Sequence, residues 1–180
     1  GAKRGKPKLN MLSKITVRER GTVPRHFQKA FTAAIRAAWQ TAGELWHDKF
    51  RHKHFTHAGA REYGYLPRKG ERGNEHEQGF RRSYTGRKLH KFGHTYPLVY
   101  TGESMRLTRM QDVRPTTKGV RVVYRAYKFN FRHPRSRIRM RDEFTRISRL
   151  EERDIRRAID NKLTSELKRP QGGETVTKFQ

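Results

Sequence analysis

The sequence predicts an α+β fold, in which a small antiparallel sheet packs against two main helices, with long basic loops and arms around them. Residues 24–53 and 148–169 repeat apolar residues at steps of three and four, which is typical of helices with one buried face. Between them, residues 113–124 alternate around a Thr-Thr-Lys-Gly turn, as two short strands do. Only 32% of the 180 residues are hydrophobic, so we expect one domain with a small core over residues 11–169.

The first residues, 1–10, have no hydrophobic periodicity and are predicted to form a basic N-terminal arm. Its cations lie beside one proline and two glycines: Lys3, Arg4, Lys6 and Lys8. After the arm, Leu12, Ile15 and Val17 sit among polar residues, which indicates a short first strand.

The first main helix is expected over residues 24–53. Thr22 is a candidate N-cap, and Pro24 occupies the first-turn position at which proline is favoured. The apolar stripe of this helix runs from Phe27 to Phe50. Gly43 interrupts the stripe at a cost of about 1 kcal/mol relative to alanine, which indicates a bend or a change of packing partner there.

An aromatic and basic loop, of about residues 54–100, is expected to be inserted in the domain. It combines aromatic, arginine and glycine residues but has almost no aliphatic residue before Leu98 and Val99. Such a segment is too poor in Val, Ile and Leu for a core strand or helix, and too rich in Tyr and Phe for a flexible linker. We therefore expect an ordered loop that docks on a partner.

The C-terminal half continues with shorter elements. A short helix could start near Glu103 and run through Leu107, and the strand pair follows it. Residues 125–131 continue as an aromatic and basic run, and residues 132–141 form an arginine-rich extended segment. Ser148 and Glu151 have the spacing of a capping box before the second main helix. This helix ends before Pro170, and residues 170–180 form a tail.

Several short motifs follow one another along the central loop: His54-Phe55, Gly59 to Tyr65 with Arg68, Tyr84, Lys88, Gly93-His94, and Pro97 to Gly102. Near the C-terminus, an arginine-bearing extended segment, residues 137–147, leads into the helix that starts at Ser148. In their order and approximate spacing, these motifs resemble small virion-morphogenesis proteins of tailed bacteriophages, the tail-completion or head–tail joining class. The chain departs from commoner members of that class in its high basicity and its long basic loop.

The resemblance implies a structural virion protein and not an enzyme, because the family has no catalytic motif. It implies a subunit of a homo-oligomeric ring, a hexamer or a dodecamer, at the head–tail junction (neck) or the tail end. Such a ring completes and seals the particle along the DNA path. The implied partners are copies of the same chain and portal (connector), capsid or tail proteins, and the implied location is the virion, assembled in the host cytoplasm.

The formal net charge of +26 predicts a polyanionic neighbour, which is packaged double-stranded DNA, an acidic protein face or both. Aromatic residues of the loop can stack on bases or anchor the loop on a neighbouring subunit, and we favour the subunit. If residues 132–141 form a strand, its arginines project from one face toward phosphates, toward an acidic adjoining ring, or into solvent at a charged edge. The predicted interface residues are Arg61, Tyr63, Tyr65, Arg68, Arg81, Arg82, Tyr84, Lys88, Arg132, Arg135, Arg137, Arg139 and Arg141, together with the cations of the arm.

The sequence offers little for catalysis or for a bound cofactor. There is no cysteine, and the histidines at positions 47, 52, 54 and 57 match no standard zinc spacing, so no metal or cofactor is expected. We expect these imidazoles on a basic surface that faces DNA or another subunit. No nucleophile triad, phosphate-binding glycine loop or nuclease motif is present, so catalysis is not expected. No apolar stretch reaches the roughly 18 residues of a membrane span, and no signal-like segment follows the arm, so no membrane partner is expected.

The alternative function is that of an RNA-binding protein of ribosomal type, which would share the basic arms, the small core and the His-Arg-Tyr loops. Tight, structure-selective RNA binding would favour this alternative. Ring formation with weak, sequence-independent DNA affinity would favour the phage subunit. A DNA-packaging accessory is a third candidate, and its binding would fall steeply as salt increases.

Overall fold

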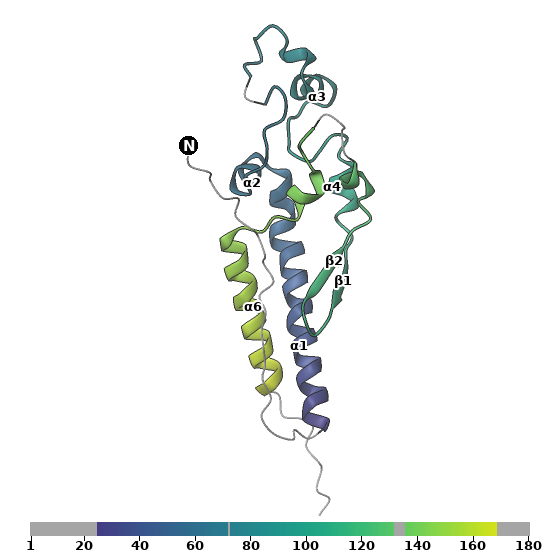
Figure 1. Ribbon diagram of the computed structural model, residues 1–180, viewed down its shortest axis with the longest axis vertical. Helices are drawn as coiled ribbons and strands as arrows, with labels where there is room; N and C mark the ends of the chain where they lie inside the picture. The colour runs from purple at the N-terminus through teal and green to yellow at the C-terminus, as the bar shows by residue number, and fades with distance from the viewer. Residues whose placement is uncertain (1–24, 72, 132–135, 169–180) are drawn as a thin grey trace, which may run out of the picture.

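The computed structural model describes residues 25–71, 73–131 and 136–168, which form an elongated α+β molecule (Figure 1). Two long helices, α1 (Arg25–Leu45) and α6 (Arg149–Lys168), lie side by side and run in opposite directions. A hairpin of β1 (Asp112–Pro115) and β2 (Val120–Val123) packs on α1. The shorter helices gather toward one end of the long axis. The predicted fold class, a small antiparallel sheet against two main helices, is confirmed.

Small residues on α1 let the two long helices approach closely. Ala34, Ala38 and Ala42 follow one another at steps of four, so they lie on one face, and all three are buried. Alanine favours the helical conformation and leaves room for a neighbour's side chain. Ile159 of α6 fills that room and is buried against Ala38 and Ala42.

Helix α1 is shorter than the predicted range of 24–53, because its α-helical geometry ends at Leu45. The chain continues as a wide π-helical turn (Trp46–Phe50) and then as a tight 3-10 turn (Arg51–Phe55). A change of winding rotates the residues that follow it away from the stripe of the preceding helix. The buried rings of His54 and Phe55 therefore pack against Phe144, outside the α1–α6 contact.

The hairpin confirms the predicted strand pair and explains the glycine inside α1. Its register pairs Val113 with Val122, and this face of the hairpin rests on α1. A β-carbon added at Gly43 would lie 2.9 Å from Cγ1 of Val113 and 2.9 Å from Cγ2 of Val120. Gly43 thus marks the point where the hairpin becomes the packing partner of α1.

Gly43→Leu is therefore expected to lower the free energy of unfolding by about 1 to 3 kcal/mol, because the added carbons must push the hairpin away from α1. Urea unfolding followed by circular dichroism measures the change. Ala33→Leu, at an exposed position of the same helix, is the control and should change stability by less than about 0.5 kcal/mol. An unchanged midpoint for Gly43→Leu would show that the hairpin does not rest there.

The main core lies in the half of the molecule that carries the short helices (Figure 1). Helix α4 (Glu103–Leu107), as predicted, and helix α5 (Met140–Phe144) close around it. The Phe144 ring is central, with centroid distances of 4.7 to 5.7 Å to five other rings: Trp46, His54, Phe55, Tyr124 and Phe129. The buried hydrophobic residues of this core are Phe55, Leu98, Val99, Ala126, Phe129 and Phe144.

The prediction that residues 54–100 form a loop was wrong in part, because the segment contains α2 (His57–Glu62) and α3 (Tyr84–Phe92). Both helices start with the same local motif. A hydroxyl, of Thr56 or of Ser83, accepts a hydrogen bond of 3.0 Å from the backbone N–H of the glycine three residues later. A β-carbon on either glycine, Gly59 or Gly86, would lie 2.0 Å from a backbone carbonyl oxygen. N-capping, and not apolar periodicity, therefore starts these helices.

The outcome near the C-terminus is mixed. The capping box is confirmed, since the backbone N–H of Ser148 donates to the Glu151 carboxylate at 3.0 Å and that of Glu151 to the Ser148 hydroxyl at 3.3 Å. The expected extended segment over residues 137–147 is interrupted by α5. The predicted arm, first strand, Thr22 cap and tail lie outside the described residues.

Candidate functional site

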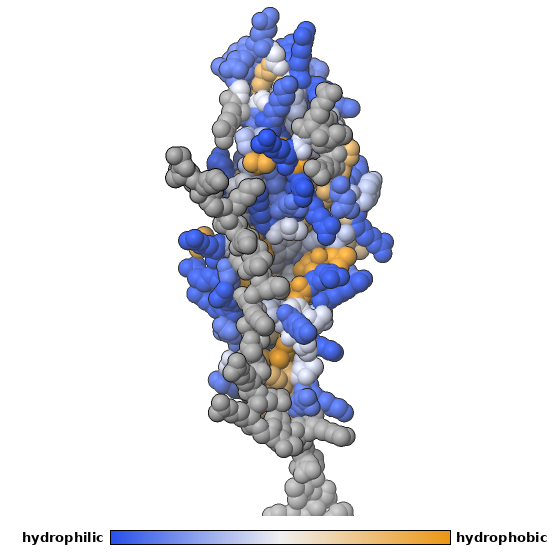
Figure 2. Space-filling model, in the orientation of Figure 1, coloured by the Kyte–Doolittle hydropathy of each residue, from blue (hydrophilic) through white to orange (hydrophobic). Residues whose placement is uncertain are grey.

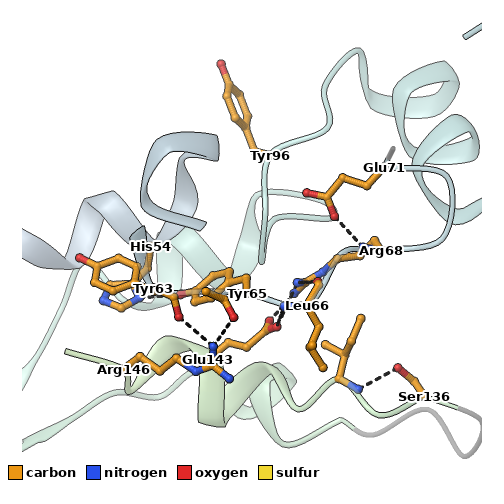
Figure 3. A network of polar contacts seen from close by, with 12 residues as sticks. His54, Tyr63, Tyr65, Leu66, Arg68, Glu71, Tyr96, Ser136, Glu143 and Arg146 are labelled. Atoms are coloured by element: carbon orange, nitrogen blue, oxygen red, sulfur yellow. Dashed lines mark hydrogen bonds and ion pairs between the residues drawn. The ribbon is translucent and has the colours of Figure 1, made fainter. Parts of the chain in front are cut away.

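The segment that follows α2 is tied to the region between α5 and α6 by a network of polar contacts (Figure 3). The buried Glu143 carboxylate accepts from the backbone N–H of Leu66 at 3.0 Å and from both terminal nitrogens of the Arg68 guanidinium. Arg146 donates to the carbonyl oxygens of Tyr63, at 2.8 Å, and of Gly64. Residues 63–68 are therefore anchored inside the subunit.

A histidine lies at the centre of this network. The His54 ring is 0% exposed and stacks on the Tyr63 ring at a centroid distance of 4.0 Å. Its Nδ1 hydrogen bonds with the Tyr65 hydroxyl at 2.6 Å, and the Tyr63 hydroxyl donates to the buried Glu151 carboxylate. Burial lowers the pKa of His54 to about 3 and raises the pKa of Glu151. The imidazole is therefore neutral and acts as a packing ring of the core.

Burial of His54 has a consequence for stability in acid. Its folded-state pKa of about 3 lies below its ordinary value of 6.5, so the unfolded chain takes up the proton first as the pH falls. The contribution of His54 to stability is thus complete above pH 6.5 and is lost progressively between pH 6.5 and about pH 3. From pH 7.5 to 5, we expect this to cost the wild-type protein about 2 kcal/mol.

The test compares urea unfolding of the wild-type protein and of His54→Asn at both pH values. We expect the variant to be less stable at both pH values. Between pH 7.5 and 5, however, its free energy of unfolding should fall by about 2 kcal/mol less than that of the wild-type protein. His52→Asn, at an exposed position of the same 3-10 turn, should keep the wild-type pH dependence. Equal losses in His54→Asn and the wild-type protein would contradict the assignment.

Lys88 of α3 is also used inside the subunit. It is 3% exposed, and its Nζ donates to the carbonyl oxygen of Tyr96. Burial lowers the pKa of Lys88 to about 8. The ammonium group thus fastens α3 to the segment that leads into the core. The predicted surface role is wrong for Tyr63 and Lys88, which are buried, whereas Tyr65 and Arg68 are half-buried and their polar groups bind within the chain.

The clustered histidines have separate environments, and the predicted basic surface of imidazoles is wrong for those that are buried. His47 hydrogen bonds with the Tyr124 hydroxyl at 3.0 Å, and His57 with the Thr95 hydroxyl at 3.1 Å. His52 is exposed. Within the described part of the chain, no three His, Asp or Glu side chains are placed to share a metal ion.

The end of the molecule that carries α3 presents a continuous run of aromatic rings. Adjacent rings in the run have centroid distances of 4.9 to 6.2 Å, in the order Tyr84, Tyr100, Phe92, His94, Tyr96 and His57. The three tyrosines are 37 to 50% exposed, and within the described residues their hydroxyls make no hydrogen bond. These tyrosines therefore offer both apolar area and hydroxyl groups to a partner.

Exposed cations lie close to this aromatic run in the sequence. Residues 78–102 contain no Asp or Glu, and they contribute the exposed side chains of Arg81, Arg82, Arg87 and Lys91. None of these four forms an ion pair with any described carboxylate. Tyr84, Arg87 and Lys91 lie on one face of α3, at steps of three and four. We call these four cations with Tyr84, Tyr96 and Tyr100 the distal surface; Figure 2 shows that side chains at this end are mainly hydrophilic.

The remaining predicted interface residues are dispersed. Arg61 is exposed on α2, and Arg137 and Arg141 are exposed near α5. Arg139 is also exposed and lies 3.7 Å from the Asp142 carboxylate. The expectation that these arginines alternate along a strand is wrong for the described residues, because residues 136–139 form no strand and Arg141 belongs to α5. Two further predicted residues, Arg132 and Arg135, lie outside the described part.

Sequence reasoning missed the burial of the Glu143 and Glu151 carboxylates and their contacts with Arg68 and Tyr63, which lie 75 and 88 positions away in the chain. No local pattern could have paired them. Tyr96, Tyr100, Arg87 and Lys91 were also missed, although the Ser83 cap and Gly93, which ends α3 in the left-handed conformation, bound this helix in the sequence.

No described helix is both long and apolar enough to cross a bilayer.

Comparison with known proteins adds no relative. No family model, curated protein or solved structure matches the chain.

Proposed function

We propose that the protein is a structural subunit of a tailed-phage particle, which forms a homo-oligomeric ring at the head–tail junction or the tail end, along the DNA path. The distal surface is the observation that supports a binding role most directly. Tyrosine and arginine are enriched at protein interfaces, and here both types are exposed within residues 78–102, a stretch without Asp or Glu. The resemblance of residues 54–102 to virion-morphogenesis proteins supports a partner within the virion.

The charge balance supports a surrounding polyanion. The chain carries 43 Lys and Arg against 17 Asp and Glu. Most described carboxylates already bind groups of the same chain, including Lys49 with Asp154 at 2.7 Å and Lys162 with Glu166 at 2.8 Å. The surplus cations therefore need anions from outside, and DNA that passes through a ring would supply them.

The test is the assembly state of the full chain. Sedimentation velocity and negative-stain electron microscopy should show closed rings, formed by the chain alone or on addition of portal or tail proteins. Labelled chain should be found at the neck or tail end of phage particles. A chain that stays monomeric with all of these partners would contradict the proposal.

The distal surface also suits single-stranded RNA, because tyrosines can stack on bases while nearby cations contact phosphates. An RNA-binding protein of ribosomal type is therefore the second candidate. Co-sedimentation with ribosomes, and a preference for folded RNA over duplex DNA at equal salt, would favour it over the phage subunit.

A further inference from the structure

Some carboxylates of the protein have no partner within the described part of the chain, and two of them lie near the distal surface. Four of the described carboxylates make no hydrogen bond or ion pair within the described residues: Glu62, Glu75, Glu77 and Asp160. Two of these, Glu75 and Glu77, belong to one exposed loop, residues 73–79, which leads directly into the turn before α3. We call this segment the acidic loop.

The acidic loop is a series of turns and not an irregular strand. Backbone N–H groups donate from Glu77 to the carbonyl oxygen of Asn74 at 3.0 Å and from Phe80 to that of Glu77 at 3.0 Å. Gly79 ends the loop with a positive φ of 105°. These turns order the backbone that carries the two exposed glutamates, which lowers the entropy cost of binding.

The acidic loop and the distal surface are neighbours in sequence, yet they do not neutralise each other. Arg81 and Arg82 lie two and three positions after the loop, and Arg87 and Lys91 follow on α3. None of these cations pairs with Glu75 or Glu77. One copy of the chain therefore presents an acidic loop and a basic surface at the same end, and both are available to bind a partner.

The presence of both an acidic loop and a basic surface at this end favours a protein partner over DNA. A DNA backbone laid on the distal surface would bring phosphates toward the acidic loop, and juxtaposed like charges are unfavourable. It would also leave the exposed tyrosines unused, because a duplex keeps its bases stacked inside. Further copies of the chain satisfy both sets, since the acidic loop of one neighbour supplies anions and the distal surface of another supplies cations.

We propose that the acidic loop of one copy docks on the distal surface of the next copy, with Glu75 and Glu77 facing Arg87 and Lys91 beside Tyr84 and Tyr100. This inference rests on the proposed ring and names the contact that builds it. The contact uses two different surfaces, so each copy binds one neighbour with its loop and another with its α3 face. Such a heterologous contact closes into a ring when the rotation between copies permits.

Charge reversal tests the contact. Glu75→Lys/Glu77→Lys makes the loop basic, and Arg87→Glu/Lys91→Glu makes the distal surface acidic. In sedimentation velocity, each variant alone should need at least about tenfold more protein than the wild type to assemble, because like charges now meet. An equimolar mixture should assemble again, because the basic loop of one variant fits the acidic surface of the other.

Arg157→Glu/Asp160→Lys reverses two exposed charges on α6 and is the matched control, which should assemble as the wild type does. Circular dichroism should show that all variants are folded. If either charge-reversed variant assembled into rings as readily as the wild type, or if the mixture did not assemble, this contact would be refuted. Neither outcome would refute the proposed ring. Loss of duplex DNA binding in Arg87→Glu/Lys91→Glu, with assembly unchanged, would assign the surface to nucleic acid. A wild-type chain that never assembles would instead refute the ring itself.

Discussion

Replacing Glu143 by alanine should lower the free energy of unfolding by about 3 to 5 kcal/mol, because one partner of a buried ion pair would be removed and the other left uncompensated. The Glu143 side chain is 2% exposed and that of Arg68 is 13% exposed. The same carboxylate also accepts the backbone N–H of Leu66, so its loss leaves a second donor without a partner. Urea unfolding of the variant measures the total effect.

Asp142→Ala is the matched control for this change. Asp142 precedes Glu143 on α5, but its side chain is 60% exposed and lies 3.7 Å from Arg139, a surface pair of little energetic value. The control should shift stability by less than about 0.5 kcal/mol. Hydrogen exchange gives an independent readout, since the amide of Leu66 should lose its protection in Glu143→Ala alone. Similar stability in both variants would show that the 63–68 segment is not held by this carboxylate.

The elements that could be predicted from the sequence are those with a strong local signal. The stripe of α1, the Thr-Thr-Lys-Gly hairpin and the Ser148–Glu151 capping box each lie within a short window, and each is present in the structure. Even the position of Gly43 carried information, because a missing side chain inside an apolar stripe indicates a close neighbour. Local propensity and packing agree at these places.

Tyr63, Tyr65, Arg68 and Lys88 show where sequence reasoning stops. A run of aromatic and basic residues is typical of a binding surface, and only long-range folding decides whether such side chains are exposed. Here Glu143 and Glu151 approach from the other end of the chain and form one polar network, in which Tyr63 is buried and Tyr65 and Arg68 are half-buried. The residues of the segment that stay exposed, among them Arg87 and Lys91, are those for which the fold provides no carboxylate.

Helices α2 and α3 were overlooked for a different reason. Both are short, and most of their residues are polar or glycine, so neither has a long apolar stripe by which it could be found. Their signal is the pattern of a hydroxyl residue, two variable residues and a glycine, at Thr56–Gly59 and again at Ser83–Gly86. A capping pattern weighed above hydrophobicity would have found both starts.

Phe144→Ala should also destabilise the protein strongly, by about 3 to 5 kcal/mol, because it removes the central ring of the main core. The Phe144 side chain is 4% exposed and contacts rings from four separate segments of the chain. Its nearest ring is Phe129, at a centroid distance of 4.7 Å. These surrounding segments belong to different elements, so they cannot all close into the cavity that the missing ring leaves.

Phe131→Ala provides the control, because this phenylalanine lies two residues after Phe129 but is 64% exposed. Its removal should change the free energy of unfolding by less than about 0.5 kcal/mol. Urea unfolding monitored by tryptophan fluorescence reports on the same region, since the Trp46 ring packs edge-on against Phe144 at 5.7 Å. A wild-type unfolding midpoint for Phe144→Ala would show that Phe144 is not the central ring of the core. A larger loss of stability in Phe131→Ala than in Phe144→Ala would contradict the assignment in the same way.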